Sequence, residues 1–283
     1  MGVLVLSPVT ATGRLFSRVN RELRLGEHRG NRIFLSPFVM APSTHAFTSL
    51  RNSLCYAPEG FKYQFLNFMS LRVGHSAIDD SWSQEAALIE QFDGRFWRSR
   101  RAMLAGQSVG IREGLGASTK SLELAEDFVY WRGYNYKPSN VASGAVYATI
   151  AAVLQNQREV DPYSGSDSLR SLVYRHAVLD PVNFEQFNDP LIQICLWRCS
   201  ESGEMDFRRS DDMSEALLHV IRHSLRDFKD GKQSALLDIL IGIAVGRIRV
   251  SRECVTAMQG DFTRQPKVAH LARDLLRAIA KLA

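Results

Sequence analysis

The sequence predicts a mainly α protein: a multi-helix globular chain with a short N-terminal α/β (strand-helix-strand) unit. Apolar runs at residues 3–7 and 32–40 flank a helical pattern at residues 13–25. Beyond residue 43, apolar side chains recur at the spacing of helices. The chain has 283 residues, 45% hydrophobic and 23% charged, which is an ordinary globular composition with enough length to bury a core.

The N-terminal unit begins with a short strand that ends at Pro8, because proline lacks the amide hydrogen that a sheet ladder uses. The predicted helix after it carries an apolar stripe and a separate arginine stripe, formed by Leu15, Val19 and Leu23 and by Arg14, Arg18 and Arg21. A second extended segment surrounds Pro37. Only this part of the chain has a strand-rich pattern.

The rest of the chain is expected to be helical. Serine, threonine or aspartate precedes several apolar segments, where a side-chain oxygen can cap a helix N-terminus. The predicted helices cover residues 44–56, 61–73, 79–92, 95–103, 118–131, a segment from 139 or 143 to 155, and residues 169–178, 190–199, 212–226, 233–245 and 266–282. The last is clearly amphipathic, with Arg273, Arg277 and Lys281 at four-residue steps on a face of their own.

A domain boundary is predicted at residues 159–168, which are polar and turn-forming. The N-terminal domain would then span residues 1–158, with the α/β unit and several helices, and the C-terminal helical domain residues 166–283. The sequence shows no internal repeat and no low-complexity tract.

The charge of the chain favours acidic partners. Its formal net charge is +5 and its pI is about 9.1, and most of the basic residues are arginine rather than lysine. A guanidinium group binds phosphate or carboxylate bidentately and stacks on aromatic planes, whereas a lysine ammonium is a solvated point charge. This preference favours nucleic-acid binding.

Arginines and large aromatic residues alternate around a glycine-rich segment in residues 95–140, the composition that phosphate contacts and base stacking require. The predicted nucleic-acid-binding residues are Arg95, Arg98, Arg100, Arg101, Arg112, Trp131, Arg132, Tyr134, Tyr136 and Lys137. Trp97 and Trp131, taken singly, are also the kind of residue that dominates cores. No helix-turn-helix or zinc-finger pattern occurs, so we expect RNA or a single strand rather than duplex DNA.

The sequence therefore predicts a non-catalytic nucleic-acid-binding subunit of a larger ribonucleoprotein or multiprotein complex. An acidic segment at residues 79–93 directly precedes the basic residues 95–101, an alternation that also suits docking between protein subunits. A subunit that binds only other proteins is accordingly one alternative.

A ribonuclease is the other alternative. Arg170 and His176 have the R-x5-H spacing that resembles the catalytic motif of HEPN ribonucleases. The resemblance implies that paired motifs of a dimer place arginine and histidine beside the scissile phosphate, without a metal. Ser171 departs from the polar amide or acid that this family usually carries there.

Other motifs are incomplete. Residues 106–110 match G-x-S-x-G but lack the strand before the serine and the helix after it, and no P-loop or dinucleotide-binding glycine pattern follows. His219 and His223 lack the glutamate of H-E-x-x-H, and Cys195 and Cys199 lack a second cysteine pair. No cofactor and no metal are therefore predicted.

A cytoplasmic location without a membrane partner is expected. The N-terminus lacks a basic segment before its short apolar run, unlike a signal peptide. The longest apolar run, residues 235–245, is interrupted by Asp238 and is too short to span a bilayer.

Overall fold

The computed structural model describes residues 2–41, 44–72, 81–105, 143–159, 169, 179–181, 189–208, 210–226 and 230–282. The chain forms two compact units. The first comprises Met1–Ala77 and Ala151–Glu159, and the second Ile78–Ile150 and Val160–Ala283. The chain thus crosses between the units at residues 159 and 160, within the predicted linker, but also near residues 77 and 150, where no boundary was predicted.

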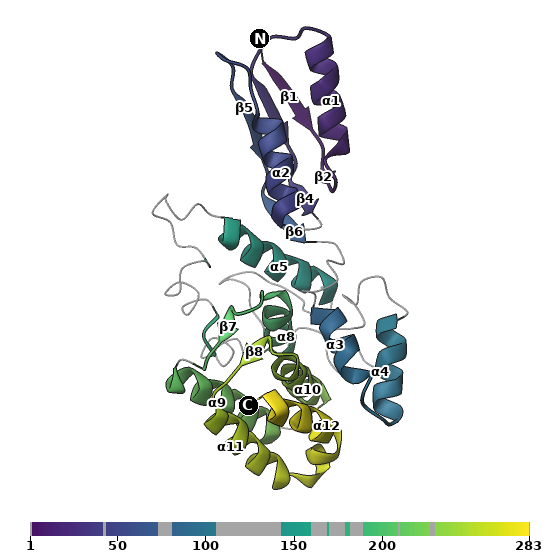
Figure 1. Ribbon diagram of the computed structural model, residues 1–283, viewed down its shortest axis with the longest axis vertical. Coiled ribbons are helices and arrows are strands. Elements are labelled where there is room, and N and C mark those ends of the chain that lie inside the picture. Colours follow the sequence, from purple (N-terminus) through teal and green to yellow (C-terminus); the bar gives the residue numbers. More distant parts are fainter. Residues whose placement is uncertain are drawn as a thin grey trace, which may run out of the picture. The chain divides into compact units, whose positions relative to one another are not determined.

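The first unit is built from three successive strand-corner-strand segments, the first two each followed by a helix (Figure 1). These elements are β1 (Val3–Leu6), β2 (Val9–Thr10), α1 (Arg14–Leu25), β3 (Arg32–Leu35), β4 (Phe38–Ala41), α2 (Thr44–Cys55), β5 (Tyr63–Leu66) and β6 (Met69–Arg72). The predicted strand-helix-strand unit is confirmed, and the protein as described is mainly α.

The strands form two parallel three-stranded sheets, β1-β3-β5 and β2-β4-β6. Leu6 pairs with Leu35 and Leu35 with Leu66, so equivalent positions of the three segments lie side by side about 30 residues apart in sequence. The expectation that the chain contains no repeat is therefore wrong for this unit. The one visible trace of the repeat in the sequence is Leu-Ser-Pro at residues 6–8 and again at residues 35–37, which the third segment lacks.

Two of the corners between the sheets have the same sequence, Ser-Pro. The Ser7 hydroxyl donates to the carbonyl oxygen of Val9 (2.9 Å), and the Ser36 hydroxyl donates to that of Phe38 (3.0 Å). Proline fixes φ and leaves no amide to satisfy, and its carbonyl still accepts from the next segment: Phe38 N–H donates to Pro8 O at 3.2 Å. Ser-Pro therefore turns the chain and joins consecutive corners.

The predicted helix at residues 61–73 is wrong, because these residues form β5 and β6. Tyr63 and Phe65 are buried whereas Leu66 is exposed, as the two-residue period of a strand requires. A short apolar run gives almost the same pattern in a buried parallel strand as in a helix, so periodicity alone could not distinguish them.

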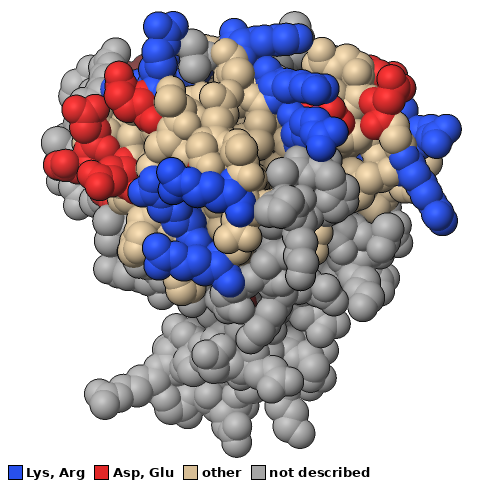
Figure 2. All heavy atoms as spheres, turned by 90° about the horizontal axis from the view of Figure 1, so that it is seen from below, with Lys and Arg blue, Asp and Glu red and all other residues tan. Residues whose placement is uncertain are grey.

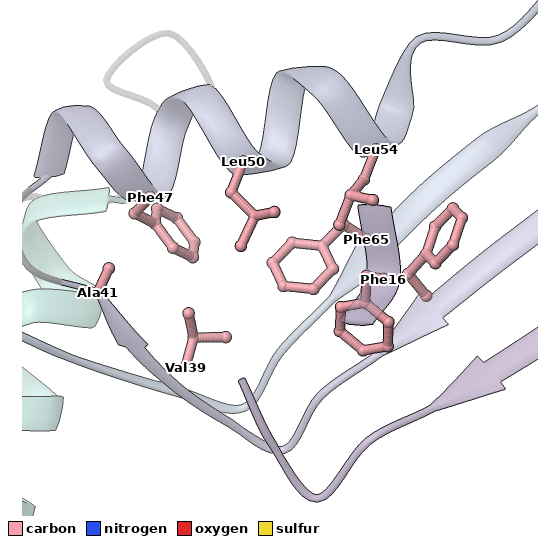
Figure 3. Packing of buried hydrophobic residues seen from close by; sticks show 8 residues of the cluster. Phe16, Val39, Ala41, Phe47, Leu50, Leu54 and Phe65 are labelled. Atoms are coloured by element: carbon pink, nitrogen blue, oxygen red, sulfur yellow. The ribbon is translucent and has the colours of Figure 1, made fainter. Parts of the chain in front are cut away.

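Helices α1 and α2 contribute to one core in the first unit (Figure 3). In α2, Phe47, Leu50 and Leu54 point toward the sheet, and Phe16 of α1 reaches the same core. The Phe16 ring makes edge contacts with Phe34 and Phe65, at centroid distances of 5.7 and 5.9 Å. Leu15, predicted for the apolar stripe of α1, is instead 58% exposed.

Buried Arg32 of β3 is also held within this unit. It donates to Asn20 Oδ1 at 2.6 Å and to the carbonyls of Asn20 and His28, and it lies 4.7 Å from the centroid of the Tyr63 ring. Asn20 is therefore buried on α1 as the partner of a core guanidinium group.

The second unit is a helical assembly around α10 (Figure 1). It contains α3 (Ser81–Ile89), α4 (Arg95–Ala105), the first part of α5 (Ser143–Glu159), α8 (Pro190–Cys199), α9 (Asp211–Arg226), α10 (Asp230–Ala244), α11 (Arg252–Thr263) and α12 (Pro266–Leu282). Short strands β7 (Met205–Asp206) and β8 (Ile248–Arg249) pair in parallel. Helix α10 contacts α8, α9 and α12, which explains why its residues from Ala235 to Ala244 are all buried.

Helix α8 begins where its sequence predicts. Asp189 accepts hydrogen bonds from the backbone N–H groups of Leu191 (2.8 Å) and Ile192 (3.1 Å), and Pro190 occupies the first turn. The apolar side chains of α8 then pack against Trp82, Val146 and Ala235. This packing brings α3, α5, α8 and α10 together around the polar cluster described below.

Candidate functional site

The described part of the predicted nucleic-acid-binding stretch is helix α4. Four of its arginines were predicted to contact nucleic acid, and the structure separates them into three environments. Arg95 and Arg98 are exposed, Arg101 is half-buried and Arg100 is buried. The arginines of α4 therefore do not form one surface.

The prediction that Arg100 contacts nucleic acid is corrected by its surroundings. Its side chain is 3% exposed, and its guanidinium group binds both carboxylate oxygens of Glu85, at 2.6 and 3.0 Å. Bidentate pairing of this kind is the strongest ion-pair geometry that proteins use. Arg100 therefore anchors α4 to α3 and has no guanidinium face to offer to a ligand.

Arg101 also has an intramolecular role. Its Nη1 donates to the backbone carbonyls of Ile89 (2.5 Å) and Phe92 (2.7 Å), at and just beyond the C-terminus of α3. Carbonyls at a helix C-terminus lack intrahelical partners, and a cation there also offsets the negative end of the helix dipole. Arg101 thus caps α3.

Trp97 is a core residue. It is 3% exposed and its ring lies against Phe92 and Phe96, with centroid distances of 5.0 and 4.8 Å. Its Nε1–H donates to Asp274 Oδ2 of α12 at 2.9 Å. This bond brings α4 beside α12, so helices almost 180 residues apart in sequence meet at this point.

Basic side chains are exposed on both of these helices. We call this set the α4–α12 surface; it comprises Arg95, Arg98, Arg273, Arg277 and Lys281. Its one described ion pair joins Arg277 to Asp274 at 3.8 Å, and Arg277 remains 72% exposed. Glu90 and Asp93 are exposed just before α4. Figure 2 accordingly shows Lys and Arg in several groups on this view, with Asp and Glu gathered beside some of them.

The other predicted site residues lie outside the described residues. These are Arg112, Trp131, Arg132, Tyr134, Tyr136 and Lys137 of the basic-aromatic stretch, Arg170 and His176 of the R-x5-H spacing, and the G-x-S-x-G residues 106–110. Of the predicted set, the structure therefore leaves Arg95 and Arg98 as exposed cations.

A cluster of four buried charges, absent from the predicted site, lies at the centre of the second unit. Arg198 of α8 donates to Glu85 of α3 at 2.7 Å and to both carboxylate oxygens of Asp238 of α10 at 3.1 Å. Arg100 completes the cluster through Glu85 and lies 4.0 Å from Asp238. Two guanidinium groups thus balance two carboxylates with almost no solvent access. We call these four residues the buried charge cluster.

Two tryptophans enclose Arg198. Its guanidinium carbon lies 3.8 Å from the Trp82 ring centroid and 4.2 Å from that of Trp197. Cation–π attraction is strongest for tryptophan and increases when the cation is desolvated. The Nη1 atom of Arg198 is buried without a hydrogen-bond partner, so the indole rings provide much of the environment of this guanidinium.

The pKa values of the two carboxylates in the buried charge cluster are shifted in opposite directions. Burial acts to raise the pKa of Glu85, but the charges and hydrogen bonds of Arg100 and Arg198 outweigh burial and lower it. For Asp238, burial raises the pKa and the nearby Glu85 charge adds to this, while Arg198 only partly offsets the two. Asp238 is therefore the more readily protonated of the two acids.

We expect Glu85→Gln to cost more stability at neutral pH than Asp238→Asn. Glu85, with a lowered folded pKa, contributes stability above its ordinary pKa that is lost as pH falls; Asp238, with a raised folded pKa, contributes stability at low pH that is lost as pH rises through it. The expected loss for Glu85→Gln is about 3 kcal/mol, and the loss for Asp238→Asn is expected to be smaller. Urea denaturation between pH 4 and pH 7 measures both, and the reverse order would contradict the assignment.

The cysteine and histidine side chains of the described residues are the other groups to consider for chemistry. Burial raises the pKa of the Cys195 thiol well above its usual range and that of Cys254 to about 11, so both stay protonated at neutral pH. His219 and His223 are exposed on α9. Within the described ranges, no cluster of three or more His, Cys, Asp or Glu side chains could hold a metal ion. No described helix is long and apolar enough to cross a membrane.

Sequence reasoning missed the buried charge cluster, although one signal for it was visible. Asp238 interrupts an otherwise apolar run that is too short for a membrane span, and a carboxylate inside a buried helix requires a cationic partner. No pattern in the sequence singles out Arg198 or Arg100 among the many arginines as that partner.

Comparison with known proteins assigns neither a family nor a function. No family model, no curated protein and no solved structure matches the chain. Its function must therefore be inferred from its own residues.

Proposed function

We propose that this chain is a non-catalytic nucleic-acid-binding subunit that holds RNA or another single strand through the α4–α12 surface. It would act in the cytoplasm within a ribonucleoprotein or other multiprotein complex. The observation that carries the proposal is the hydrogen bond between Trp97 and Asp274, which joins α4, with its exposed Arg95 and Arg98, to α12, with its basic stripe.

The chemistry of the surface supports phosphate as the ligand. Arg273, Arg277 and Lys281 follow one another at four-residue steps, so their side chains extend from one face of α12 along about 12 Å of its axis. That length spans a few nucleotides of a single strand. Guanidinium groups bind phosphate oxygens bidentately, and each phosphate neutralised releases counterions, which is a major source of nucleic-acid affinity.

Arg100 is not part of the proposed binding surface, because its guanidinium group is buried against Glu85. Arg95 and Arg98 remain because they are exposed and flank Trp97, the residue that fixes α4 against α12. Cations on two elements placed side by side can follow a flexible backbone without entering a groove, and this favours a single strand over duplex DNA.

The test is a charge reversal on α12. We expect Arg273→Glu combined with Arg277→Glu to weaken binding of a fluorescent single-stranded RNA by about tenfold or more at low salt. The slope of log K against log salt should also become shallower by about 1.4, because two phosphate contacts are lost. Fluorescence anisotropy at four or five salt concentrations measures both quantities.

The matched control reverses two arginine charges on a helix outside the α4–α12 surface. Arg14→Glu with Arg18→Glu reverses two exposed arginines of α1 in the first unit and alters net charge equally. This control is expected to retain most of the affinity and the salt slope. Equal losses in both double variants would exclude the α4–α12 surface, and wild-type binding no stronger than that of an unrelated protein of equal net charge would exclude nucleic-acid binding.

A further inference from the structure

The outer face of the sheets in the first unit carries large exposed apolar side chains. Successive side chains along a strand point to opposite faces, so the neighbours of the core residues Phe34, Val39 and Phe65 point away from α1 and α2. We call this the outer sheet face. Its most exposed apolar strand residues are Leu4, Leu6, Val9, Phe38 and Leu66, and Phe68 adjoins them in the corner between β5 and β6; each is between 45% and 71% exposed.

The strand register aligns these side chains in continuous rows across the sheets. One row is Leu6, Leu35 and Leu66, and the next is Val9, Phe38 and Met69. Two further rows pair Leu4 with Ile33 and Gln64, and Met40 with Leu71. These rows contain no charged side chain, and Gln64 is their one polar member. The apolar surface is therefore a contiguous patch rather than scattered exposed residues.

A parallel sheet normally has both faces covered, because its strands are apolar on both sides. Here α1 and α2 contribute to the same core on one side, so neither covers the other face. The six most exposed residues alone present about 600 Å² of surface, the upper end of the roughly 300–600 Å² that the largest apolar patch of a typical monomer reaches, and patches of that size are often functional. Such a face is chemically suited to a protein surface and unsuited to the phosphate proposed for the basic helices.

We infer that the outer sheet face is the contact between two copies of this chain, related by a twofold axis. Two such faces would together bury about 1,200 Å² from the six residues alone, which reaches the size of a specific dimer interface. Apolar rows on a sheet can pack face to face against the same rows of a second copy, about 10 Å apart. An uncharged face meets its own copy without like-charge repulsion, even though the chain as a whole has a net charge of +5.

The inference predicts that the full chain is a dimer in solution and that charges on the outer sheet face dissociate it. Sedimentation equilibrium of the wild type should give twice the chain mass at micromolar concentration. Leu6→Glu combined with Phe38→Glu should give the monomer mass and weaken association by at least about 100-fold, since four carboxylates would be desolvated in one interface.

Two further variants make the experiment specific. Leu25→Glu places a charge on α1, where the leucine is 71% exposed away from the sheets, and should leave the dimer intact. Phe38→Ser removes the aromatic side chain without adding charge; it should weaken the dimer while circular dichroism stays that of the wild type. This second variant keeps the test valid if the double glutamate variant fails to fold.

Three outcomes would overturn the inference. The wild type could remain monomeric up to about 100 μM, which would mean that another protein or another part of the chain covers the face. Leu25→Glu could dissociate the dimer as strongly as the outer-face variants, or those variants could dimerise like the wild type. RNA binding tests a different surface: Arg273→Glu with Arg277→Glu should remain dimeric, so failure of either proposal is distinguishable from failure of the other.

Discussion

Replacing Arg198 by alanine is expected to lower the free energy of unfolding of the second unit by about 3–5 kcal/mol. Arg198 is the cation that touches both carboxylates of the buried charge cluster. Its removal leaves Asp238 buried with only the more distant Arg100, at 4.0 Å, and also empties the space between Trp82 and Trp197. An unpaired buried charge and a cavity both destabilise a fold.

The matched control is Arg208→Ala. Arg208 also forms a bidentate pair, with Asp206, but its side chain is 54% exposed, and water can solvate both partners when the pair is broken. Urea denaturation followed by far-ultraviolet circular dichroism compares the two variants. A midpoint for Arg198→Ala as close to the wild type as that of Arg208→Ala would show that the cluster does not stabilise the unit.

Replacing Phe16 by alanine is expected to destabilise the first unit by about 3–5 kcal/mol. Phe16 is the fully buried side chain of α1 at which the rings of Phe34 and Phe65 meet (Figure 3). The unit is small, so a cavity of this size removes a large part of its core. Thermal unfolding measures the effect as a lower midpoint temperature for the unfolding transition of the first unit.

Leu15→Ala, one residue earlier, is the control for this substitution. Leu15 is mostly exposed, so its truncation removes little buried surface and should leave the transition nearly unchanged. Equal destabilisation by the two variants would contradict the assignment of Phe16, rather than the predicted Leu15 stripe, as the contact of α1 with the core.

The sequence predicts the helices better than the strands, for a physical reason. An amphipathic helix such as α12 shows a long 3.6-residue period, and α8 has an aspartate cap followed by proline, so their bounds can be predicted almost to the residue. The strands have four residues or fewer, too short for a two-residue period to stand out. Their pairing into stacked segments depends on contacts about 30 residues apart, which only the Ser-Pro corners at Ser7 and Ser36 indicate.

The candidate site is harder to predict than the fold. Arg98 and Arg100 are both arginines of one helix, and the sequence does not show which faces solvent and which faces Glu85. That choice depends on where α3 and α10 lie. Their positions are set by tertiary contacts such as Arg100–Asp238 and Arg198–Glu85, whose partners are more than a hundred residues apart in sequence. An arginine cluster therefore predicts that cations are present, while burial decides which of them can meet a ligand.

The placement of tryptophan makes the two units spectroscopically distinct. All four tryptophans, Trp82, Trp97, Trp131 and Trp197, belong to the chain segments of the second unit, and the first unit has none. Intrinsic indole emission should therefore follow unfolding of the helical assembly around Arg198 and remain insensitive to melting of the stacked parallel strands. A difference in midpoint between the unfolding curve from indole emission and the curve from circular dichroism would report, without any label, which of the two units unfolds first.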